Sequence, residues 1–230
     1  MNANIGATKD MEKININKKE ISKKIYRFFK RFVDIIGALV GCIILLPLTL
    51  GIWIANIIAK DNGPVFYMQK RIGRNGKVFT MYKYRSMVVN ADRKLKRYLL
   101  DNPEANKEFL EFRKLKHDPR VTVVGKFIRK TSLDEFPQFI NVLKGDMSLV
   151  GPRPYLPREK RVMKKAYKEI IKVKPGLTGP WQVNGRSEIS LEDRMQMDIE
   201  YIQNENLLND TKYLFQTVLK IVKRDNEGAM

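Results

Sequence analysis

The 230-residue chain is 43% hydrophobic and carries a formal net charge of +19. This hydrophobic content can bury a core, which excludes a wholly disordered chain, and the positive charge requires an anionic partner: nucleic acid, an acidic membrane or a phosphorylated substrate. With one cysteine, Cys42, and one histidine, His117, the sequence has neither a disulfide framework nor a thiol-based metal site.

The first residues predict a polar tail that leads into a membrane-associated segment. Residues 1–22 are polar and are typical of a tail that stays mobile until it meets a partner. Residues 18–31 carry seven Lys or Arg against one Glu, interleaved with aromatic and aliphatic side chains. This pattern predicts a basic helix that lies at a membrane interface.

Residues 35–59 contain no charged residue, and these 25 positions exceed the ~20 that a helix needs to cross a bilayer core. Pro47, near the middle, removes a backbone hydrogen bond and kinks the helix. Residues 18–31 are basic, and residues 60–97 carry eleven Lys or Arg against two Asp, so both flanks favour the cytoplasmic side. A helix that enters the membrane, breaks at Pro47 and returns satisfies both flanks, and a kinked spanning helix is the alternative.

A β-hairpin is predicted over residues 63–87, because apolar and polar residues alternate on both sides of Gly73 and Asn75-Gly76. Lys83 and Arg85 come at its end, where the residues alone favour a basic face toward anionic lipid as much as an active-site role. Residues 92–116 then predict a mobile, peripheral helical hairpin.

An acidic pair, Asp134-Glu135, lies at the centre of the most informative stretch, residues 131–154. Asp134 suits the N-cap of a short helix that has Pro137 in its first turn and Gly145 as its C-cap. The pair would then be ionised beside backbone N–H groups that are able to hold a phosphate. The structural alternative is an ordinary capping pair.

Cations flank this acidic pair in the sequence. Arg129 precedes it, and the Gly-Pro-Arg-Pro motif at 151–154 fixes Arg153 on a loop that joins neither a helix nor a central strand. Cations around paired carboxylates indicate phosphate chemistry, with a divalent metal between the acid and the anion.

The last third of the chain predicts helices around one loop. Residues 158–174 predict a basic amphipathic helix that lies at a membrane surface or over a core, with nucleic-acid binding as the competing interpretation. Residues 174–186 predict a Gly/Pro-rich loop that ends in Arg186. The loop contains Trp181, whose structural interpretation is a packing anchor.

Two closing helices are predicted at 190–204 and 210–223. They carry Asp198 and Asp210, and a helical Asp is on its own more typical of a cap or a surface charge.

Several ordered motifs together resemble one protein family. They are KRFVD at 30–34, YKYRSM at 82–87, DPRVTVVGKFIRKTSLDE at 118–135, KPGLTGPWQVNGR at 174–186 and MDIEYI at 197–202. With them, nearly everything after Lys30 resembles the bacterial sugar transferases, the monotopic phosphoglycosyl transferases that load a sugar phosphate onto polyprenol phosphate.

The resemblance implies transfer of hexose-1-phosphate from a UDP-sugar to undecaprenyl phosphate with release of UMP, a priming step of surface polysaccharide or glycoconjugate synthesis. It implies a covalent phospho-sugar intermediate on Asp134, and Mg²⁺ held by Glu135 and Asp134. The substrate- and phosphate-binding residues that it implies are Lys83, Arg85, Arg129, Arg153, Arg186, Asp198 and Asp210.

The expected fold is α+β and mostly helical, with a tail at 1–22, an interfacial helix and re-entrant membrane helix at 23–60, and a small catalytic domain at 61–230 that contains the hairpin. The expected place is the cytoplasmic face of the bacterial inner membrane, with anionic lipids as partners and no nucleic acid. The identity of the sugar and the pathway stay open, as do monomer and homodimer, although two-fold dimers are the commonest oligomers.

Three alternatives explain part of the pattern. A membrane-tethered nucleic-acid binder explains the charge, but the sequence shows no recognisable reading helix, stacking motif or zinc module. A non-catalytic membrane scaffold explains the basic helices but leaves the acidic pair without a role. Ordinary glycosyl transfer would release UDP rather than UMP, so the nucleotide product separates it from phospho-sugar transfer.

Overall fold

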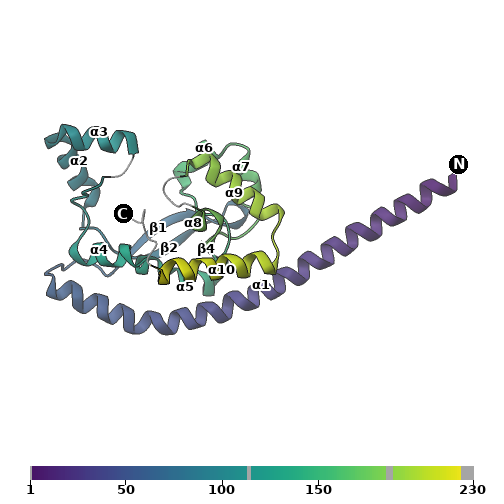
Figure 1. Ribbon diagram of the computed structural model, residues 1–230, viewed down its shortest axis with the longest axis horizontal. Coiled ribbons are helices and arrows are strands. Elements are labelled where there is room, and N and C mark those ends of the chain that lie inside the picture. The colour runs from purple at the N-terminus through teal and green to yellow at the C-terminus, as the bar shows by residue number, and fades with distance from the viewer. Residues whose placement is uncertain (1, 113–114, 185–188, 224–230) are drawn as a thin grey trace.

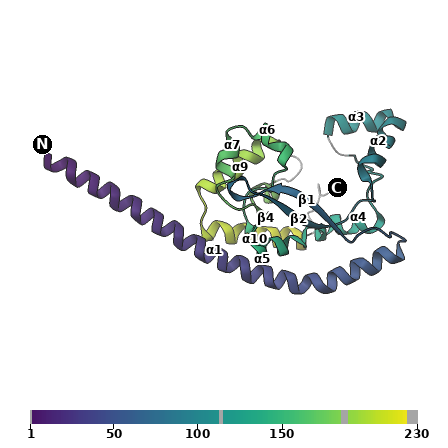
Figure 2. The same cartoon turned by 180° about the vertical axis from the view of Figure 1, so that it is seen from behind.

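The computed structural model describes residues 2–112, 115–184 and 189–223. It shows a long N-terminal helix, α1 (Asn2–Ile58), that bows around one side of a smaller α+β domain (Figure 1). The view from behind shows the same arrangement, with the domain on the concave side of α1 (Figure 2). The prediction of a mostly helical α+β fold is confirmed.

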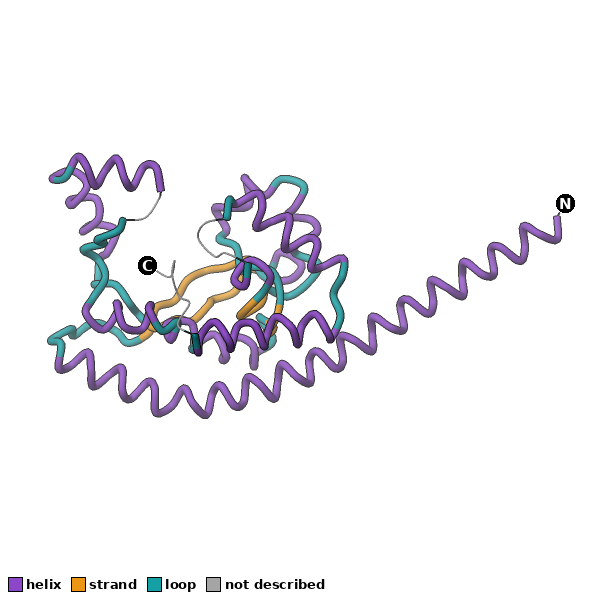
Figure 3. The backbone as a smooth tube through the Cα atoms, in the orientation of Figure 1, coloured by secondary structure: helices purple, strands orange, loops and turns teal. Residues whose placement is uncertain are grey.

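The domain alternates short helices with two pairs of short strands, which lie in its middle (Figure 3). After α1 the elements are β1 (Phe66–Ile72), η1 (Arg74–Gly76), β2 (Val78–Tyr84), α2 (Ala91–Asp101), α3 (Pro103–Phe112), α4 (Val123–Lys130), η2 (Leu133–Glu135), α5 (Gln138–Lys144), β3 (Ser148–Val150), η3 (Pro157–Glu159), α6 (Lys160–Met163), α7 (Ala166–Ile170), β4 (Gly176–Thr178), α8 (Pro180–Val183), α9 (Leu191–Gln203) and α10 (Leu207–Val222).

The predicted hairpin is confirmed as β1 and β2, which pair antiparallel from Phe66 opposite Tyr84 to Ile72 opposite Val78. Its turn is the short 3₁₀ helix η1, where Asn75 has φ 59° and Gly76 has φ 75°. This left-handed conformation is one that Asn and Gly adopt readily, which is why the Asn-Gly pair marked the turn.

The helix α1 packs on the domain along one face. Ala38, Leu45 and Ile52 on that face are at most 7% exposed. Close approach requires glycine at two positions of the face: a Cβ on Gly37 would lie 2.6 Å from Leu149 Cδ1, and a Cβ on Gly41 would overlap the ring of Phe139. This seam therefore depends on small residues one helical turn apart.

The predicted break at Pro47 is not an interruption of the helix, because α1 continues through Pro47 to Ile58 and is bent rather than divided (Figure 1). The Thr49 hydroxyl donates to the Leu45 carbonyl oxygen at 2.6 Å and also contacts the Tyr84 hydroxyl at 2.6 Å. Bonding of this kind bends a helix without ending it, and packing of Leu45 and Ile52 holds both sides of the bend on the domain.

Two other segments differ from the predictions in part. The predicted helix over 158–174 is divided into η3, α6 and α7, with Lys164 at φ 46° between the last two. The predicted 92–116 hairpin is present as α2 and α3, which stand off from the other elements in both views, although its mobility stays a prediction (Figures 1 and 2). The predicted tail is part of α1, and its mobility also stays a prediction.

Candidate active site

The acidic pair lies in η2, a single 3₁₀ turn between α4 and α5. The prediction that Asp134 caps a helix is wrong, because α5 begins only at Gln138 and Pro137 occupies the N-cap position. The predicted C-cap is confirmed, since Gly145 ends α5 with φ 86°. Asp134 and Glu135 therefore do not serve as helix caps, and their side chains are available for other contacts.

Lys83 joins the hairpin to this turn. It comes near the end of β2, and its Nζ donates to Glu135 Oε1 at 2.7 Å and lies 3.7 Å from Asp134 Oδ2. The side chains of Lys83 and Asp134 are about one-fifth exposed, at 21% and 18%, and that of Glu135 is 39% exposed. One ammonium group thus faces two adjacent carboxylates at the surface of the fold.

The pKa of Asp134 is raised to about 6, mainly by burial and also by the neighbouring Glu135 carboxylate, while Lys83 and Arg129 act to lower it. Burial dominates because it disfavours the charged form of a carboxyl group. Asp134 is consequently ionised at neutral pH but has a much more basic carboxylate than an ordinary Asp, with a pKa close to neutrality. A more basic carboxylate is a better nucleophile.

A cavity of about 80 Å³ opens beside Lys83 and Glu135. It is also lined by Arg71 and Arg153, so three cations surround it. Among the described residues, the buried Nε atoms of Arg71 and Arg153 have no hydrogen-bond partner. Unpartnered guanidinium donors beside a polar cavity suit a phosphate group, which accepts several such hydrogen bonds.

Arg71 enters this cavity from β1. Its Nη1 donates to the Pro154 carbonyl oxygen at 2.8 Å and its Nη2 to Gln69 Oε1 at 2.5 Å, which fixes the guanidinium group beside the Gly-Pro-Arg-Pro loop. Burial and the nearby charge of Arg153 lower the pKa of Arg71 to about 10. Arg71 remains protonated at neutral pH, so the cavity keeps two adjacent positive charges.

Arg153 is fixed by stacking of its side chain on Trp181 and by a hydrogen bond from its backbone N–H to Asp198. Its guanidinium group lies 4.8 Å from the centre of the Trp181 ring, and Arg194 also stacks on Trp181 at 5.3 Å. The Arg153 N–H donates to Asp198 Oδ2 at 3.1 Å, and the Tyr155 hydroxyl donates to the same oxygen at 2.8 Å. Trp181 is thus a packing anchor that also orients an active-site arginine.

Asp198 is fully buried and reaches the site through Arg153 rather than directly. Burial raises its pKa to about 7, although the hydrogen bonds from Tyr155 and from the Arg153 backbone lower it. The structure gives Asp198 the role of a buried support for the Gly-Pro-Arg-Pro loop.

Two of the predicted arginines lie outside the cavity lining. Arg129 donates from Nε to Ser86 Oγ at 2.8 Å and contributes its charge to Asp134. Arg85 donates to both carboxylate oxygens of Asp61 at 3.0 Å, and its Nε donates to the Pro64 carbonyl oxygen. Arg85 therefore fixes the chain between α1 and β1.

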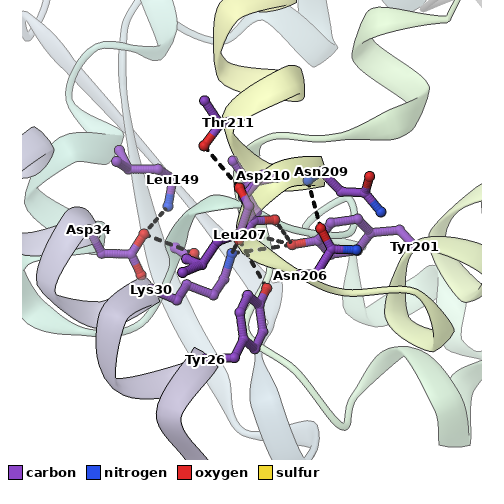
Figure 4. Close-up of polar contacts among 12 residues, drawn as sticks. Tyr26, Lys30, Asp34, Leu149, Tyr201, Asn206, Leu207, Asn209, Asp210 and Thr211 are labelled. Carbon is purple, nitrogen blue, oxygen red and sulfur yellow. Dashed lines mark hydrogen bonds and ion pairs between the residues drawn. The ribbon is translucent and has the colours of Figure 1, made fainter. Parts of the chain in front are cut away.

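Asp210 lies in a different cluster, between α1 and α10 (Figure 4). Its Oδ2 accepts from Lys30 Nζ at 2.6 Å and from the Tyr26 hydroxyl at 2.9 Å, while its Oδ1 accepts from the Tyr201 hydroxyl at 2.6 Å. This cluster docks the part of α1 that contains Tyr26 and Lys30 onto the domain. The last predicted residue, Arg186, lies outside the described residues.

Sequence reasoning missed three polar residues that line the cavity: Arg71, Gln138 and Gln182. Arg71 belongs to a hairpin rich in Lys and Arg, where nothing local distinguishes it from its neighbours. The hairpin register places Arg71 opposite Phe79 and Lys83 opposite Tyr67, so the two cations come from different strands and different levels of the sheet. Only the tertiary fold brings both to Glu135.

The carboxylates of Asp134 and Glu135 fit a Mg²⁺ ion. Mg²⁺ is a hard cation that binds through one or two carboxylates, water and substrate phosphate oxygens rather than through a closed protein cage. Adjacent, partly exposed carboxylates beside a cation-lined cavity are a donor set of this kind.

The fold and the site define a small domain that is docked on a helix with a large exposed apolar surface and has a site suited to phosphate groups. The chain matches the family described as Bacterial sugar transferase over residues 25–224. It belongs to this family, which confirms the resemblance found in the sequence.

Curated relatives agree with this assignment. The chain is 45% identical over 205 residues to the Undecaprenyl-phosphate galactose phosphotransferase of Salmonella typhimurium, a match that covers 89% of this chain and 43% of that protein. It is 39% identical over 204 residues to the UDP-glucose:undecaprenyl-phosphate glucose-1-phosphate transferase of Escherichia coli, covering 85% of this chain and 40% of the relative. The chain thus spans less than half the length of these two proteins.

A relative of similar length is the Exopolysaccharide production protein ExoY of Sinorhizobium fredii, which is 42% identical over 189 residues. That match covers 82% of this chain and 83% of the relative. The core domain described here therefore also occurs without the additional sequence of the longer proteins.

Proposed function

We propose that this protein transfers a hexose-1-phosphate from a UDP-sugar to undecaprenyl phosphate and releases UMP, the priming step of a surface polysaccharide or glycoconjugate. The observation that carries the proposal is the carboxylate pair of η2, which faces Lys83. Glu135 and Lys83 line a cavity together with Arg71 and Arg153, and Asp134 lies next to this lining. The names of the relatives support the lipid and sugar classes.

In the first step a carboxylate oxygen of Asp134 attacks the sugar-linked phosphorus of the donor. The bond from this phosphorus to the bridging oxygen breaks, UMP leaves with that oxygen, and a phospho-sugar ester of Asp134 remains. Both reactants are anionic, so the step requires neutralising charges. Lys83 and Arg129 supply them at the carboxylate, and Arg71 and Arg153 supply them at the phosphate oxygens.

In the second step an oxygen of the lipid phosphate attacks the same phosphorus and expels the Asp134 carboxylate. The product is a sugar joined to the lipid through a diphosphate, and Asp134 returns to its ionised form without a net proton transfer. Lys83 stabilises the carboxylate as it leaves, because its ammonium group is already placed 3.7 Å from Asp134 Oδ2.

Glu135 and Asp134 would hold Mg²⁺ together with the donor phosphates. When bound, the ion neutralises phosphate charge and so supports attack by an anion. Glu135 already keeps Lys83 in place through the 2.7 Å contact, so the residue has a positioning role of its own.

We further propose that α1 lies in the cytoplasmic leaflet and does not span the bilayer. Residues 20–58 of α1 form a stretch long and apolar enough to cross a membrane, and its outer face exposes large apolar side chains such as Ile43 at 69% and Leu46 at 74%. The opposite face contacts the domain from Tyr26 to Ile52. If the helix spanned with these contacts kept, part of the polar domain would lie within the bilayer core.

The proposed reaction is tested with a panel of UDP-sugars, undecaprenyl phosphate and Mg²⁺, with the nucleotide product identified by chromatography. Release of UMP together with a lipid-linked diphosphate sugar is the expected result. Release of UDP would show ordinary glycosyl transfer and reject the proposed reaction.

A further inference from the structure

A second cavity, of about 230 Å³, lies between α1, the hairpin turn and the segment before β4. It shares no lining residue with the cavity beside Glu135. A single bound water needs only about 10–15 Å³, so this cavity is much larger than a packing defect. It is smaller than the ~300 Å³ at which pockets for drug-sized ligands begin. The volume suits a small headgroup better than a whole nucleotide sugar.

The lining of this cavity is strongly basic. Its six cationic residues are Arg27, Lys30, Arg31, Arg74, Lys172 and Lys174, against the two carboxylates of Asp34 and Glu205. Lys30 is paired with Asp210 and Lys172 with Glu169, both from outside the lining. Positive charge still exceeds negative charge among the remaining lining residues.

Two of these cations, Arg31 and Lys174, lie beside Gly145 at the C-terminal end of α5. Arg31 also donates to the carbonyl oxygens of Val142 and Leu143 at the end of α5. Within the described part of the chain, no carboxylate lies within 4.0 Å of Lys174 or Arg74.

One of the two carboxylates of the lining, Asp34, is already hydrogen-bonded within the protein. Asp34 Oδ1 accepts from the Ser148 hydroxyl at 2.9 Å and from the Leu149 N–H at 2.8 Å, and the residue is 3% exposed. Burial, with the charges of Arg31 and Arg74, lowers the pKa of Lys174, although the charges of Asp34 and Asp146 act to raise it. An anion bound here would relieve this repulsion.

The position of the cavity along α1 indicates the source of the anion. Arg31 comes four residues before Ile35, where the uncharged stretch begins, which is about 6 Å along a helix axis. Exposed aromatic side chains, Phe28, Phe29 and Phe32, flank Arg31 on the outer face of α1. The cavity therefore adjoins the surface of α1 that faces lipid in the proposed arrangement, where phospholipid headgroups lie.

We infer that this cavity binds the phosphate group of an anionic phospholipid, with Arg74 and Lys174 as the protein-side ligands and Arg27 and Arg31 at the membrane side. The bound lipid would fix the depth and orientation of α1 in the membrane. The inference is independent of the sugar transfer reaction, because it concerns a separate cavity and is tested by binding alone.

The test measures binding of short-chain phosphatidylglycerol to the full chain in zwitterionic micelles, by calorimetry. The variant R74Q/K174Q should bind at least about tenfold more weakly than the wild type, because two cations next to the phosphate are lost. The control variant K94Q/K96Q removes the same charge from exposed positions of α2 and should bind within about twofold of the wild type. K174R keeps the charge and should retain binding, and circular dichroism checks that each variant is folded.

Equal weakening of both double variants would show general attraction to charge and overturn the inference, as would unchanged binding by R74Q/K174Q. Competition separates the sources of phosphate. Inorganic phosphate that displaces the lipid at equal concentration would assign the cavity to a soluble anion. Undecaprenyl phosphate that displaces it at much lower concentration would assign the cavity to the acceptor, and either result rejects a phospholipid site.

Discussion

Lys83 is the residue whose contacts decide the chemistry of the site. Its single ammonium group is 2.7 Å from Glu135 and 3.7 Å from Asp134. It therefore forms an ion pair with Glu135 and lowers the pKa of Asp134. Burial disfavours the ionised form of Asp134, and Lys83 is the largest of the influences that lower its pKa, which is about 6. A nucleophile that is basic yet ionised at neutral pH results from this balance.

Replacement of Lys83 with Met should change the pH dependence of transfer as well as the rate. The wild-type rate should fall as the pH drops through about 6, where Asp134 becomes protonated. K83M removes a positive charge that favours the ionised carboxylate, so this acidic limb should move to higher pH. The rate at neutral pH should fall about ten- to a hundredfold, in line with the loss of one charged hydrogen bond.

The pH–rate profile of K83M is compared with those of K83R, which keeps the charge, and K77M, which removes a charge at the hairpin turn. A K83M profile with the wild-type acidic limb would show that Asp134 is not the group that titrates.

At the scale of elements, the docking of α1 on α10 depends on a small buried polar cluster. Asp210 accepts hydrogen bonds from Lys30, Tyr26 and Tyr201, which come from two other helices. A carboxylate with several donors is costly to remove, because the donors remain buried without a partner. Surface ion pairs such as Arg97 with Asp101 contribute far less.

D210A should therefore lower the free energy of unfolding by about 1–3 kcal/mol, whereas D101A should change it by less than about 1 kcal/mol. Denaturant unfolding in detergent, followed by tryptophan fluorescence, measures both. The family resemblance implied a substrate role for Asp210. A D210A protein of wild-type stability with a raised KM would support that role and contradict the structural one.

The sequence predicted the elements whose signals are local. Alternation and the Asn-Gly turn were sufficient for the hairpin, and Gly145 marked the end of α5. The single helix expected over 158–174 was wrong, because the chain turns between α6 and α7 at Lys164, which has φ 46°. The Asn75 N–H donates to the Ile171 carbonyl oxygen at 2.7 Å, which ties α7 to the hairpin turn, and periodicity contains no information about such a contact.

The site was predictable only where its residues are adjacent or belong to a family motif. Asp134, Glu135 and Lys83 were named and lie together, and Arg153 was correctly placed on a rigid loop. Arg71 was missed because its role depends on the register of two strands. Arg85, which was also named, pairs with Asp61 and does not line the cavity, and its substrate contact stays a prediction.

At the scale of the whole molecule, α1 has two faces with different roles. Its inner face packs on the domain through Gly37, Ala38 and Gly41, and its outer face exposes apolar side chains. The bend at Pro47 lets the helix follow the domain. In the proposed monotopic arrangement both basic flanks stay on one side of the membrane. The proposed arrangement would place the carboxylate pair near the membrane surface that carries the proposed lipid acceptor.

A monotopic arrangement is tested with cysteines placed at both ends of α1. Ser22 and Asn62 are exposed, and Asn62 avoids the ion pair that Asp61 makes with Arg85. In a C42A background, S22C and N62C should react with a membrane-impermeant maleimide from the same face of sealed vesicles. Labelling from opposite faces would show a spanning helix and reject the arrangement.

The most direct test of the account is covalent labelling by a UDP donor whose sugar is radioactive, in the absence of the lipid acceptor. The wild type should retain the label on the protein and release UMP, and added undecaprenyl phosphate should remove the label. D134N should retain no label while its melting temperature stays near that of the wild type, because Asp134 does not cap a helix. The adjacent control, E135Q, should still be labelled, but more slowly. A D134N protein that is labelled, or that turns over at nearly the wild-type rate, would contradict the proposed aspartyl intermediate.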